Sequence, residues 1–364
     1  MKLTSLQLEH FRNYTKLDFA FPDEPILVLS GENAQGKTSF LEALYLLALT
    51  KSFRTSDTEF LKQFEKDYFR IVGTMQNGSD VTRLELCEIH EPSFKKVLKK
   101  NGTVLSAPKF IGNLKAVLFR PEDLQMLTGE PALRRKYLNT MLIQTVPGYM
   151  RQLQTYQKVL TQRNALLFQM KQGNATRSAL EIWDSQLVDS GSQIIAARLE
   201  LIDFLSSEMP EPYSISYKST IFSDETNESQ LQTSFADALS DALARDARSA
   251  HTSVGPHRDD IQLQIGGKPL ELTASRGELR SCLMALKQAE IAWMQSKTGT
   301  TPLILLDDIF SELDTQRKTN LFDLLPTDAQ IIMTIAEGNP LPASPKLKSS
   351  AAVRQVHDGH IANT

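Results

Sequence analysis

The chain has 364 residues, of which 41% are hydrophobic and 23% are charged, and its formal net charge is −3. A chain of this size can bury a large core, and we expect it to form two structural units. The charge balance excludes extensive disorder and a wholly basic protein that coats nucleic acid, so any contact with DNA should be local.

The two cysteines, Cys87 and Cys282, are far apart and lack the spacing of a metal site. We expect both to be buried, reduced thiols, as in a reducing cytoplasm. The amino-terminal segment alternates polar and apolar residues, and nowhere do ~18 consecutive apolar residues occur. The sequence therefore predicts a cytoplasmic protein that is neither exported nor membrane-spanning.

The first fifty residues predict a strand, a loop and a helix. Residues 6–21 alternate apolar and polar side chains on either side of Arg12-Asn13-Tyr14, which predicts a hairpin. The apolar run 26–29 predicts a strand covered on both faces, and apolar residues recur at helical spacing over 41–48. Between them lies GENAQGKT, in the context that a phosphate-binding loop requires.

Each residue of this loop has an expected role in binding a nucleotide. Backbone N–H groups should surround the β-phosphate, Lys37 should reach the β- and γ-phosphates, and the Thr38 hydroxyl should ligate Mg²⁺. The predicted ATP-binding residues of the loop are Gly31, Glu32, Asn33, Ala34, Gln35, Gly36, Lys37 and Thr38.

Residues 58–118 predict short strands, including 70–74 and 81–89, and a hairpin turn at Asn101-Gly102. Four lysines flank this turn, at positions 95, 96, 99 and 100. They are either a solvated hairpin tip or a patch for the DNA backbone.

The middle of the chain is helical in pattern. Apolar residues keep a four-three spacing over 149–170 and again over 180–204, which predicts two helices joined by a short polar loop. They should form an antiparallel, coiled-coil-like arm of about 30 to 40 Å. A strand at 213–217 and an Ala-rich helix with charges at positions 241, 245 and 248 follow.

Two charged clusters are open to more than one interpretation. His257-Arg258-Asp259-Asp260 is a metal or catalytic cluster, a structural turn held by ion pairs, or a surface for DNA or a partner. Arg134-Arg135-Lys136 is either a charged helix start that faces DNA or a solvated face.

The apolar run 303–306 predicts a second buried strand, which ends in Asp307-Asp308. A carboxylate at such an end can hold the water shell of Mg²⁺, and its neighbour can accept a proton from the attacking water. We assign Asp307 to the metal and Asp308, with Lys37, to catalysis. The alternative is that the pair only caps the strand.

Ser275-Arg276-Gly277-Glu278 opens a predicted helix with an apolar face from 279 to 293. Ser275 and Glu278 have the spacing of a capping box. The same helix start can also bind an anion, which in a head-to-tail dimer is the γ-phosphate held by the other subunit.

Four segments in this order resemble the ATPase head that ABC-type ATPases share with SMC proteins. They are GENAQGKT as Walker A, SRGE as signature, LILLDD as Walker B and SELD at 311–314 as D-loop. The sequence further resembles the RecF family of bacterial recombination mediators, in LEHFRNY at 8–14, VLFRPEDLQMLTGEPALRRKYLN at 117–139, TSVGPHRDD at 252–260, ASRGELR at 274–280 and LLDDIFSELD at 305–314.

The resemblance implies an α/β fold: an ABC/SMC-like head with a second, mainly helical domain that carries the arm. The expected domains are a first head part at 1–120, a helical arm domain at 121–250 and a second head part at 251–364. By motif, Arg12 and Asn13 would approach the nucleotide, and Ser275, Gly277 and Asp314 would complete the ATP site across a dimer.

The implied function is that of a homodimer that forms on ATP, with Mg²⁺, and binds DNA at gaps or single-strand/double-strand junctions. It would help to load recombinase in DNA repair, replication restart and the SOS response, with RecR and RecO as partners and no membrane. The ATPase would be slow, DNA-stimulated and used as a conformational switch.

The sequence departs from transporter-type ATPases at the switch position, where Thr334 replaces histidine, so slow hydrolysis is expected. The Q-loop residue stays open among Gln125, Glu122 and Asp123. Two alternative functions are a transporter motor subunit, which would need a membrane partner, and a small-molecule P-loop kinase, which failure to dimerise with ATP would favour.

Overall fold

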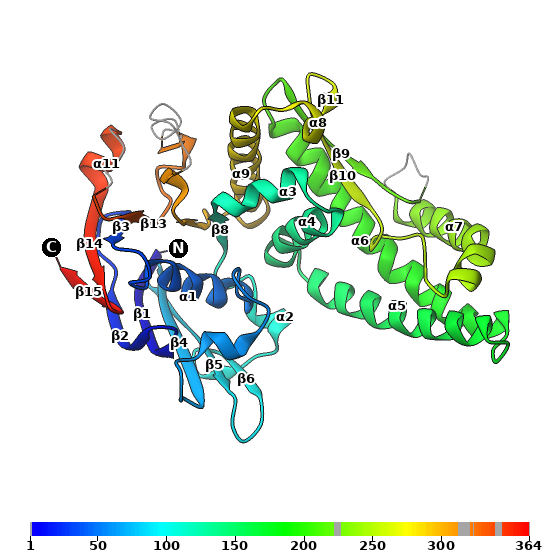
Figure 1. The fold of residues 1–364 in the computed structure, drawn as a ribbon, viewed down its shortest axis with the longest axis horizontal. Helices are drawn as coiled ribbons and strands as arrows, with labels where there is room; N and C mark the ends of the chain where they lie inside the picture. The colour runs from blue at the N-terminus through cyan, green and yellow to red at the C-terminus, as the bar shows by residue number, and fades with distance from the viewer. Residues whose placement is uncertain (1, 222–226, 312–320, 323, 339–343, 364) are drawn as a thin grey trace. The chain divides into compact units, whose positions relative to one another are not determined.

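The computed structural model describes residues 2–221, 227–311, 321–322, 324–338 and 344–363. The chain divides into two units, Met1–Asp123 with Glu290–Thr364, here called the head unit, and Leu124–Ala289, called the arm unit. The two colour ranges of the head unit, blue to cyan and orange to red, can be followed in Figure 1.

The division differs from the predicted one chiefly at its second boundary. Residues 251–289, expected in the head, belong to the arm unit. The reason is strand pairing, because β10 (Asp260–Ile265) pairs antiparallel with β9 (Tyr213–Lys218) of the same unit. The return to the head occurs inside a single helix, α9 (Arg276–Thr298), and a continuous apolar helix carries no sequence signal of a boundary.

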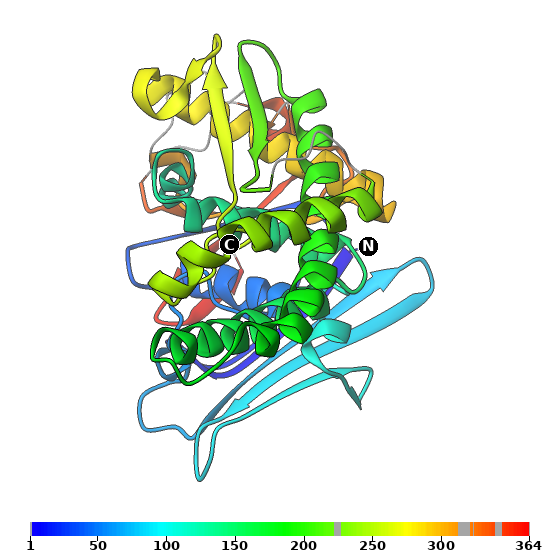
Figure 2. The ribbon, with the colours of Figure 1, turned by 90° about the vertical axis from the view of Figure 1, so that its right-hand side faces the viewer.

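The head unit contains an antiparallel sheet in the order β2-β1-β4-β5-β6-β7. Its strands are β1 (Lys2–Phe11), β2 (Tyr14–Ala20), β4 (Tyr68–Asn77), β5 (Asp80–Ile89), β6 (Lys95–Lys100) and β7 (Thr103–Val104). β1 and β2 form the predicted hairpin, in which Phe11 faces Tyr14 across the turn. Figure 2 shows the long, twisted ribbons of this sheet in light blue and cyan.

The second sheet of the head unit has the order β15-β14-β3-β13-β12-β8, and neighbours from β14 to β8 run parallel. Its strands are β3 (Ile26–Gly31), β8 (Ala116–Phe119), β12 (Leu303–Leu306), β13 (Ile331–Ala336), β14 (Ala351–His357) and β15 (His360–Asn363). The strands β3 and β12 are buried throughout, as their unbroken apolar runs predicted. The carboxyl-terminal strands β14 and β15 pair antiparallel as a hairpin.

Helix α1 (Lys37–Leu49) contacts strands of both sheets, including β3, β4 and β13. It is buried on nearly every side, which explains why its apolar residues are not confined to one face. The other short helices of the head unit are η1 (Thr58–Leu61), α2 (Ala107–Phe110), η2 (Pro121–Asp123), η4 (Ile309–Ser311) and α11 (Pro345–Ser350).

The arm unit is mainly helical, with one small sheet in the order β11-β10-β9. Its remaining elements are α3 (Leu124–Thr128), α4 (Pro131–Thr145), α5 (Tyr149–Lys171), η3 (Arg177–Leu180), α6 (Glu181–Glu208), α7 (Glu228–Ser249), β11 (Lys268–Pro269) and α8 (Leu270–Thr273).

The two long helices α5 and α6 are antiparallel, as predicted. Gln152 bonds to Gln193, Gly191 lies against the ring of Tyr156, and Arg163 pairs with Asp184, so positions rise along one helix as they fall along the other. Helix α7 packs on both. The arm is therefore a three-helix cluster, and the third helix has its own apolar face, which includes Leu231, Phe235 and Leu239.

Both cysteines are free thiols; Cys282 is buried and Cys87 is half-buried. Burial raises the pKa of Cys282 to about 12 and raises the pKa of Cys87, so both stay protonated near neutral pH. Among the described residues, no helix combines the length and the apolar character needed to cross a bilayer.

Candidate nucleotide-binding site

The predicted phosphate loop connects β3 to α1 in the head unit. Gly36, directly before the helix, has φ +115°, and a Cβ there would lie 2.7 Å from Nδ2 of Asn13. A Cβ on Gly31 would clash with the backbone oxygen of Val356. Both positions therefore require glycine, one for its backbone angle and both for the close approach of a neighbouring chain segment.

Lys37 is the first residue of α1 and is 9% exposed. Its Nζ donates to the backbone oxygens of Gly31, at 2.5 Å, and Glu32, at 2.6 Å, so the ammonium group lies inside the curl of the loop. Burial lowers the pKa of Lys37, and the nearby carboxylates of Asp308 and Asp307 oppose that shift. Lys37 thus bonds to the loop and interacts electrostatically with the two aspartates.

The structure brings the predicted metal residues together. The Thr38 hydroxyl donates to Oδ1 of Asp307 at 2.9 Å, although 269 positions separate them in sequence. Thr334, from β13, donates to the same oxygen at 2.9 Å. Burial raises the pKa of Asp307, and the two hydroxyl donors act in the opposite direction. This carboxylate is therefore fixed between α1 and β13.

Asp308 follows with φ +48°, a left-handed backbone conformation that a non-glycine residue adopts rarely. Its N–H donates to the Thr334 hydroxyl at 2.9 Å. Thr334 therefore links both aspartates through one hydroxyl group. The sequence analysis noted only that Thr334 replaces the histidine of transporter-type ATPases. The structure shows that its hydroxyl contacts both aspartates.

A cavity of about 490 Å³ lies above this cluster in the head unit. Predicted site residues that line it are Arg12, Asn13, Asn33, Ala34, Gly36, Lys37, Thr38 and Asp308. Lining residues that the sequence analysis missed are Ser39, Arg54, Phe60, Lys62 and Ala336, and Thr334, expected at the switch position, also lines the cavity. Gly31, Glu32, Gln35 and Asp307 belong to the loop and the cluster without lining the cavity.

Arg12 is held at the cavity wall by a buried carboxylate. Its Nε and one terminal nitrogen donate to the two oxygens of Glu42 at 2.9 and 2.7 Å, and its other terminal nitrogen donates to the Phe60 backbone oxygen. Glu42, on α1, is 0% exposed and also pairs with Arg54 at 3.4 Å. Glu42 occupies a helical position within an apolar run, which is the signal that could have identified it.

Asn13 supports the loop from the β1–β2 turn. Its Nδ2 donates to the backbone oxygen of Gln35 at 2.8 Å, and the neighbouring Tyr14 hydroxyl donates to the backbone oxygen of Gly36 at 3.1 Å. The hairpin turn at residues 12–14 therefore contributes both a cavity wall, through Arg12, and a brace for the phosphate loop.

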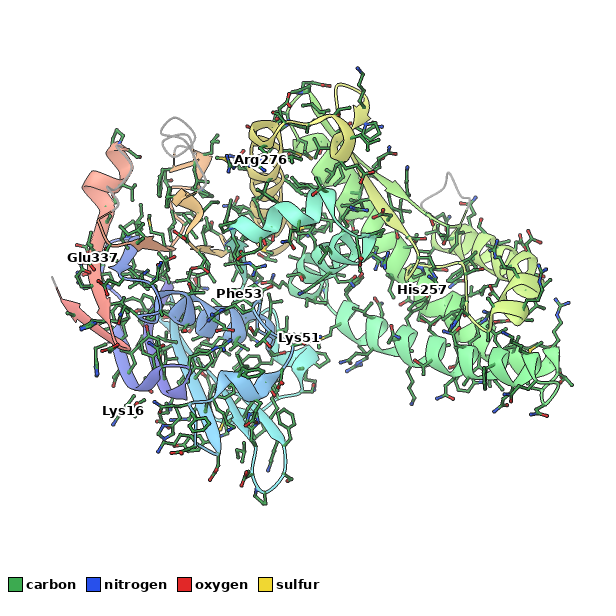
Figure 3. The ribbon with its side chains drawn as sticks, in the orientation of Figure 1. Lys16, Lys51, Phe53, His257, Arg276 and Glu337 are labelled. Atoms are coloured by element: carbon green, nitrogen blue, oxygen red, sulfur yellow. The ribbon has the colours of Figure 1, made fainter. Side chains whose placement is uncertain are left out.

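The signature segment begins α9 in the arm unit. The Ser275 N–H donates to a carboxylate oxygen of Glu278 at 2.7 Å, and the Glu278 N–H donates to the Ser275 hydroxyl at 3.3 Å. The capping box expected as one alternative is therefore formed. Ser275 and Arg276 are exposed and Gly277 is half-buried, so this first turn is open to solvent (Figure 3). Asp314, the D-loop residue, lies outside the described residues.

The Q-loop candidates differ in their surroundings. Asp123 is paired with Arg120 at 3.2 Å, whereas the charge of Glu122 contributes to the raised pKa of Asp307. Gln125 is exposed on α3 of the arm unit. Within the head unit, Glu122 therefore acts on Asp307 through its charge, and Asp123 is paired with Arg120.

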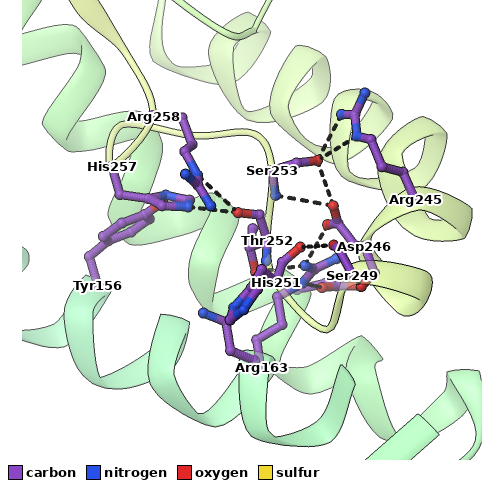
Figure 4. Close-up of polar contacts among 12 residues, drawn as sticks. Tyr156, Arg163, Arg245, Asp246, Ser249, His251, Thr252, Ser253, His257 and Arg258 are labelled. Carbon is purple, nitrogen blue, oxygen red and sulfur yellow. Dashed lines mark hydrogen bonds and ion pairs between the residues drawn. The ribbon is translucent and has the colours of Figure 1, made fainter. Parts of the chain in front are cut away.

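The cluster around His257 is built into the arm unit (Figure 4). The His257 ring bonds to the Tyr156 hydroxyl at 2.6 Å and to the Thr252 backbone oxygen at 3.0 Å. Burial, reinforced by Arg258 and Arg135, lowers the pKa of His257 to about 4, so the ring is neutral at pH 7.

The two aspartates of this cluster also have structural partners. Asp259 is 0% exposed and accepts hydrogen bonds from the Tyr217 hydroxyl and from Thr220. Asp260 accepts two bonds of 2.7 Å from Arg134. These contacts favour the structural-turn interpretation for His257, Asp259 and Asp260.

The other basic clusters are compensated only in part, although Arg134 is paired with Asp260. Arg135 donates to the backbone oxygen of Asp259, and Lys136 is exposed. On the β6 hairpin, Lys96 pairs with Glu88 at 2.7 Å and Lys99 pairs with Glu85 at 3.2 Å. The carboxylates neutralise these two lysines, which argues against the DNA patch; with two of the four paired within the sheet, the hairpin is also not simply a solvated tip.

Comparisons with known proteins agree with this geometry. Residues 5–250 match the family model described as AAA domain. The chain is 35% identical over 347 residues to the DNA replication and repair protein RecF of Bacillus mycoides (strain KBAB4), covering 92% of each chain, and 34% identical over 345 residues to that of Bacillus cytotoxicus, covering 92% and 91%.

Solved structures give the same result. The recombination mediator protein RecF-ATP in the RecFOR pathway superposes with a TM-score of 0.89 at 29% identity, covering all of this chain and 97% of the other. An Smc head bound to the C-winged helix domain of ScpA, at 14% identity and a TM-score of 0.51, shares the fold. The chain therefore belongs to the RecF family of DNA replication and repair proteins, with the α/β head of the SMC type and a mainly helical second part.

Proposed function

We propose that the chain binds and slowly hydrolyses ATP in the cavity of the head unit and uses ATP to control its association with a second copy and with DNA. The observation that carries this proposal is the convergence of the phosphate loop, Lys37 and the Thr38–Asp307–Thr334–Asp308 cluster around one cavity. The family assignment supports it, since a relative has been solved as RecF-ATP.

The residues present fit a magnesium ion. Thr38 and Asp307 offer a hydroxyl and a carboxylate oxygen that already lie 2.9 Å apart, and Mg²⁺ prefers hard oxygen ligands together with phosphates. Bound there, the ion would neutralise part of the triphosphate charge. The raised pKa of Asp307 supports the same role, because burial destabilises its charged form and a bound cation would stabilise that form.

The remaining residues divide the chemistry between them. Backbone N–H groups of the loop and the start of α1 bind the β-phosphate, and Lys37 moves from the loop carbonyls to the β- and γ-phosphates. Asp308 accepts the proton of the attacking water, and Thr334 fixes its backbone. Arg12 and Arg54, at the cavity wall, supply positive charge.

The switch follows from the exposed first turn of α9. With its capping box satisfied internally, the helix start still presents Ser275 and Gly277 to solvent, where the γ-phosphate held by a second copy can bind. Two such contacts per dimer provide the differential affinity for the closed state. Closure joins basic residues of both copies into one DNA-binding surface. A local surface of this kind allows a protein with a net charge of −3 to bind DNA.

The biological role proposed is that of a recombination mediator. The relatives are named as DNA replication and repair proteins, and the solved relatives belong to the RecFOR pathway. By that relationship the chain binds gapped or junction DNA, helps to load recombinase in repair, replication restart and the SOS response, and works with RecR and RecO. The family assignment argues against the transporter-motor and small-molecule-kinase alternatives.

The test is the mass of the protein in solution, by light scattering, with and without ATP, Mg²⁺ and gapped DNA. Wild type should dimerise and bind DNA only with ATP. Lys37→Met should lose ATP binding, Ser275→Arg should bind ATP as a monomer, and Asp308→Asn should remain a DNA-bound dimer because hydrolysis is blocked.

Ser275→Asn keeps the helix cap without the serine hydroxyl, so it separates loss of the cap from loss of the contact with the second copy. If Ser275→Arg dimerises like wild type, the split site is wrong. If wild type binds ATP but stays monomeric and ignores DNA, the switch is wrong and nucleotide binding alone remains.

A further inference from the structure

We propose that the turn of the carboxyl-terminal hairpin, His357-Asp358-Gly359, is a positioning element that holds the phosphate loop in its binding conformation and thereby sets the affinity for ATP. The inference rests on the proposed ATP binding. It concerns residues more than 300 positions from the loop that no motif marks, and it is carried by contacts within the head unit.

The turn binds both the side chain and the backbone of Gln35. The Asp358 N–H donates to Oε1 of Gln35 at 2.7 Å, and the Gly359 N–H donates to the Gln35 backbone oxygen at 3.1 Å. His357 Nδ1 lies 3.2 Å from the same Oε1. Since that oxygen already accepts from a backbone N–H, the amide orientation is fixed, and His357 must carry its proton on Nδ1 to donate as well.

Two glycines beside these bonds are closely packed against neighbouring backbone. A Cβ on Gly359 would lie 2.5 Å from the Asn13 backbone oxygen, and one on Gly31 would clash with the Val356 oxygen at the end of β14. Asn13 in turn donates to the Gln35 backbone oxygen. Gln35 is therefore clamped between two hairpin turns, one from each sheet of the head unit.

The phosphate loop needs such a clamp because its backbone is strained. Ala34 has φ +66°, a left-handed conformation that costs an L-residue about 1 to 2 kcal/mol, and Gly36 has φ +115°. Strained residues persist only where the surroundings over-determine them. A loop fixed before binding loses less conformational freedom when the phosphates arrive, so its support contributes directly to affinity.

Gln35 acts on the nucleotide only through the loop. It does not line the cavity, whereas its neighbours Ala34 and Gly36 do. Its side chain is committed to the hairpin turn, and none of the three turn residues lines the cavity. The geometry thus gives the hairpin a role in ATP affinity that needs no contact with ATP.

The chain contains a matched control for this idea. Asp358-Gly359 and Asn101-Gly102 are both two-residue hairpin turns with positive φ at each central residue, +46° and +72° against +49° and +82°. An alanine in place of either glycine carries a similar backbone cost. Only Gly359→Ala meets a neighbour, because nothing lies within 4 Å of a Cβ on Gly102.

The experiment compares the ATP dissociation constant and the melting temperature of Gly359→Ala and Gly102→Ala, with calorimetry as the readout of binding. Gly102→Ala should lose only the stability that its backbone angle costs, and Gly359→Ala should lose more, because its Cβ also meets the Asn13 backbone. Gly359→Ala alone should bind ATP about tenfold more weakly, the effect of losing roughly one to two hydrogen bonds to the loop.

Side-chain variants separate the bonds from the fold. His357→Leu should weaken ATP binding about threefold, and His357→Gln, which keeps a donor, should restore it. Asp358→Asn retains the backbone donor and tolerates the left-handed conformation, so it should bind like wild type. If Gly359→Ala binds ATP as tightly as Gly102→Ala, the positioning role is overturned while the ATP site stands. If wild type itself fails to bind ATP, both proposals fall.

Discussion

The buried carboxylate of Glu42 should make a large electrostatic contribution to the stability of the head unit. It is 0% exposed and holds two arginines, Arg12 at 2.7 Å and Arg54 at 3.4 Å. Glu42→Gln keeps the volume and removes the charge. The new amide also turns an N–H₂ donor toward the donors of Arg12, so at least one of the two bonds to that guanidinium is lost.

The magnitude follows from burial. Removing one partner of a buried pair costs about 3 to 5 kcal/mol, because the other charge is left uncompensated. The side chains of Arg12 and Arg54 are 17% and 44% exposed, so water screens both cations and reduces the loss to about 2 to 3 kcal/mol. For a unit of this size, that corresponds to a fall of about 5 to 10 °C in the melting temperature.

The assay is thermal unfolding followed by circular dichroism, with Glu9→Gln as control. Glu9 also pairs with an arginine, Arg70 at 3.2 Å, but it is 34% exposed, so its loss should cost less than about 1 kcal/mol. A Glu42→Gln protein that melts within the shift of the Glu9→Gln control would refute the reasoning, since burial would then not determine the cost.

Two further predictions concern pH and hydrolysis. The pKa of His257 is about 4 in the folded protein against 6.5 ordinarily, so its neutral form contributes stability that is complete above pH 6.5 and is lost as pH falls toward 4. Urea unfolding at a series of pH values should show a loss of about 2 to 3 kcal/mol over this range that is absent in His257→Gln. Thr334→Val should leave the ATP dissociation constant nearly unchanged but slow single-turnover hydrolysis about 10- to 100-fold, because Asp307 and Asp308 lose their common hydroxyl partner. An unchanged rate would mean that Thr334 only packs.

Much of both units could be predicted from local pattern. The buried strands β3 and β12, the loop between β3 and α1, and the capping box of Ser275 and Glu278 all depend on residues within a few positions of one another. The pairing of α5 with α6 was also predictable, because a short connection between two helices of matching apolar period leaves them antiparallel.

The domain boundary and the charged clusters were not predictable in this way. Asp259 and Asp260 are structural because Tyr217, Thr220 and Arg134 surround them, and these partners come from elements far away in the chain. The same sequence, His257-Arg258-Asp259-Asp260, on an exposed turn without these partners would have been available for binding. A charged side chain has the same appearance in sequence whether or not a partner meets it.

The sequence by itself determined the phosphate loop, the acidic end of β12 and the family to which the chain belongs, because each depends on short runs of residues with a local physical meaning. Only the tertiary structure decided which groups contact these segments. Thr334 bonds to Asp307, Glu42 bonds to Arg12, and the carboxyl-terminal hairpin turn bonds to Gln35. These contacts join segments up to 323 positions apart. Sheet order places β13, which carries Thr334, and β14, which leads into the hairpin turn, on either side of β3.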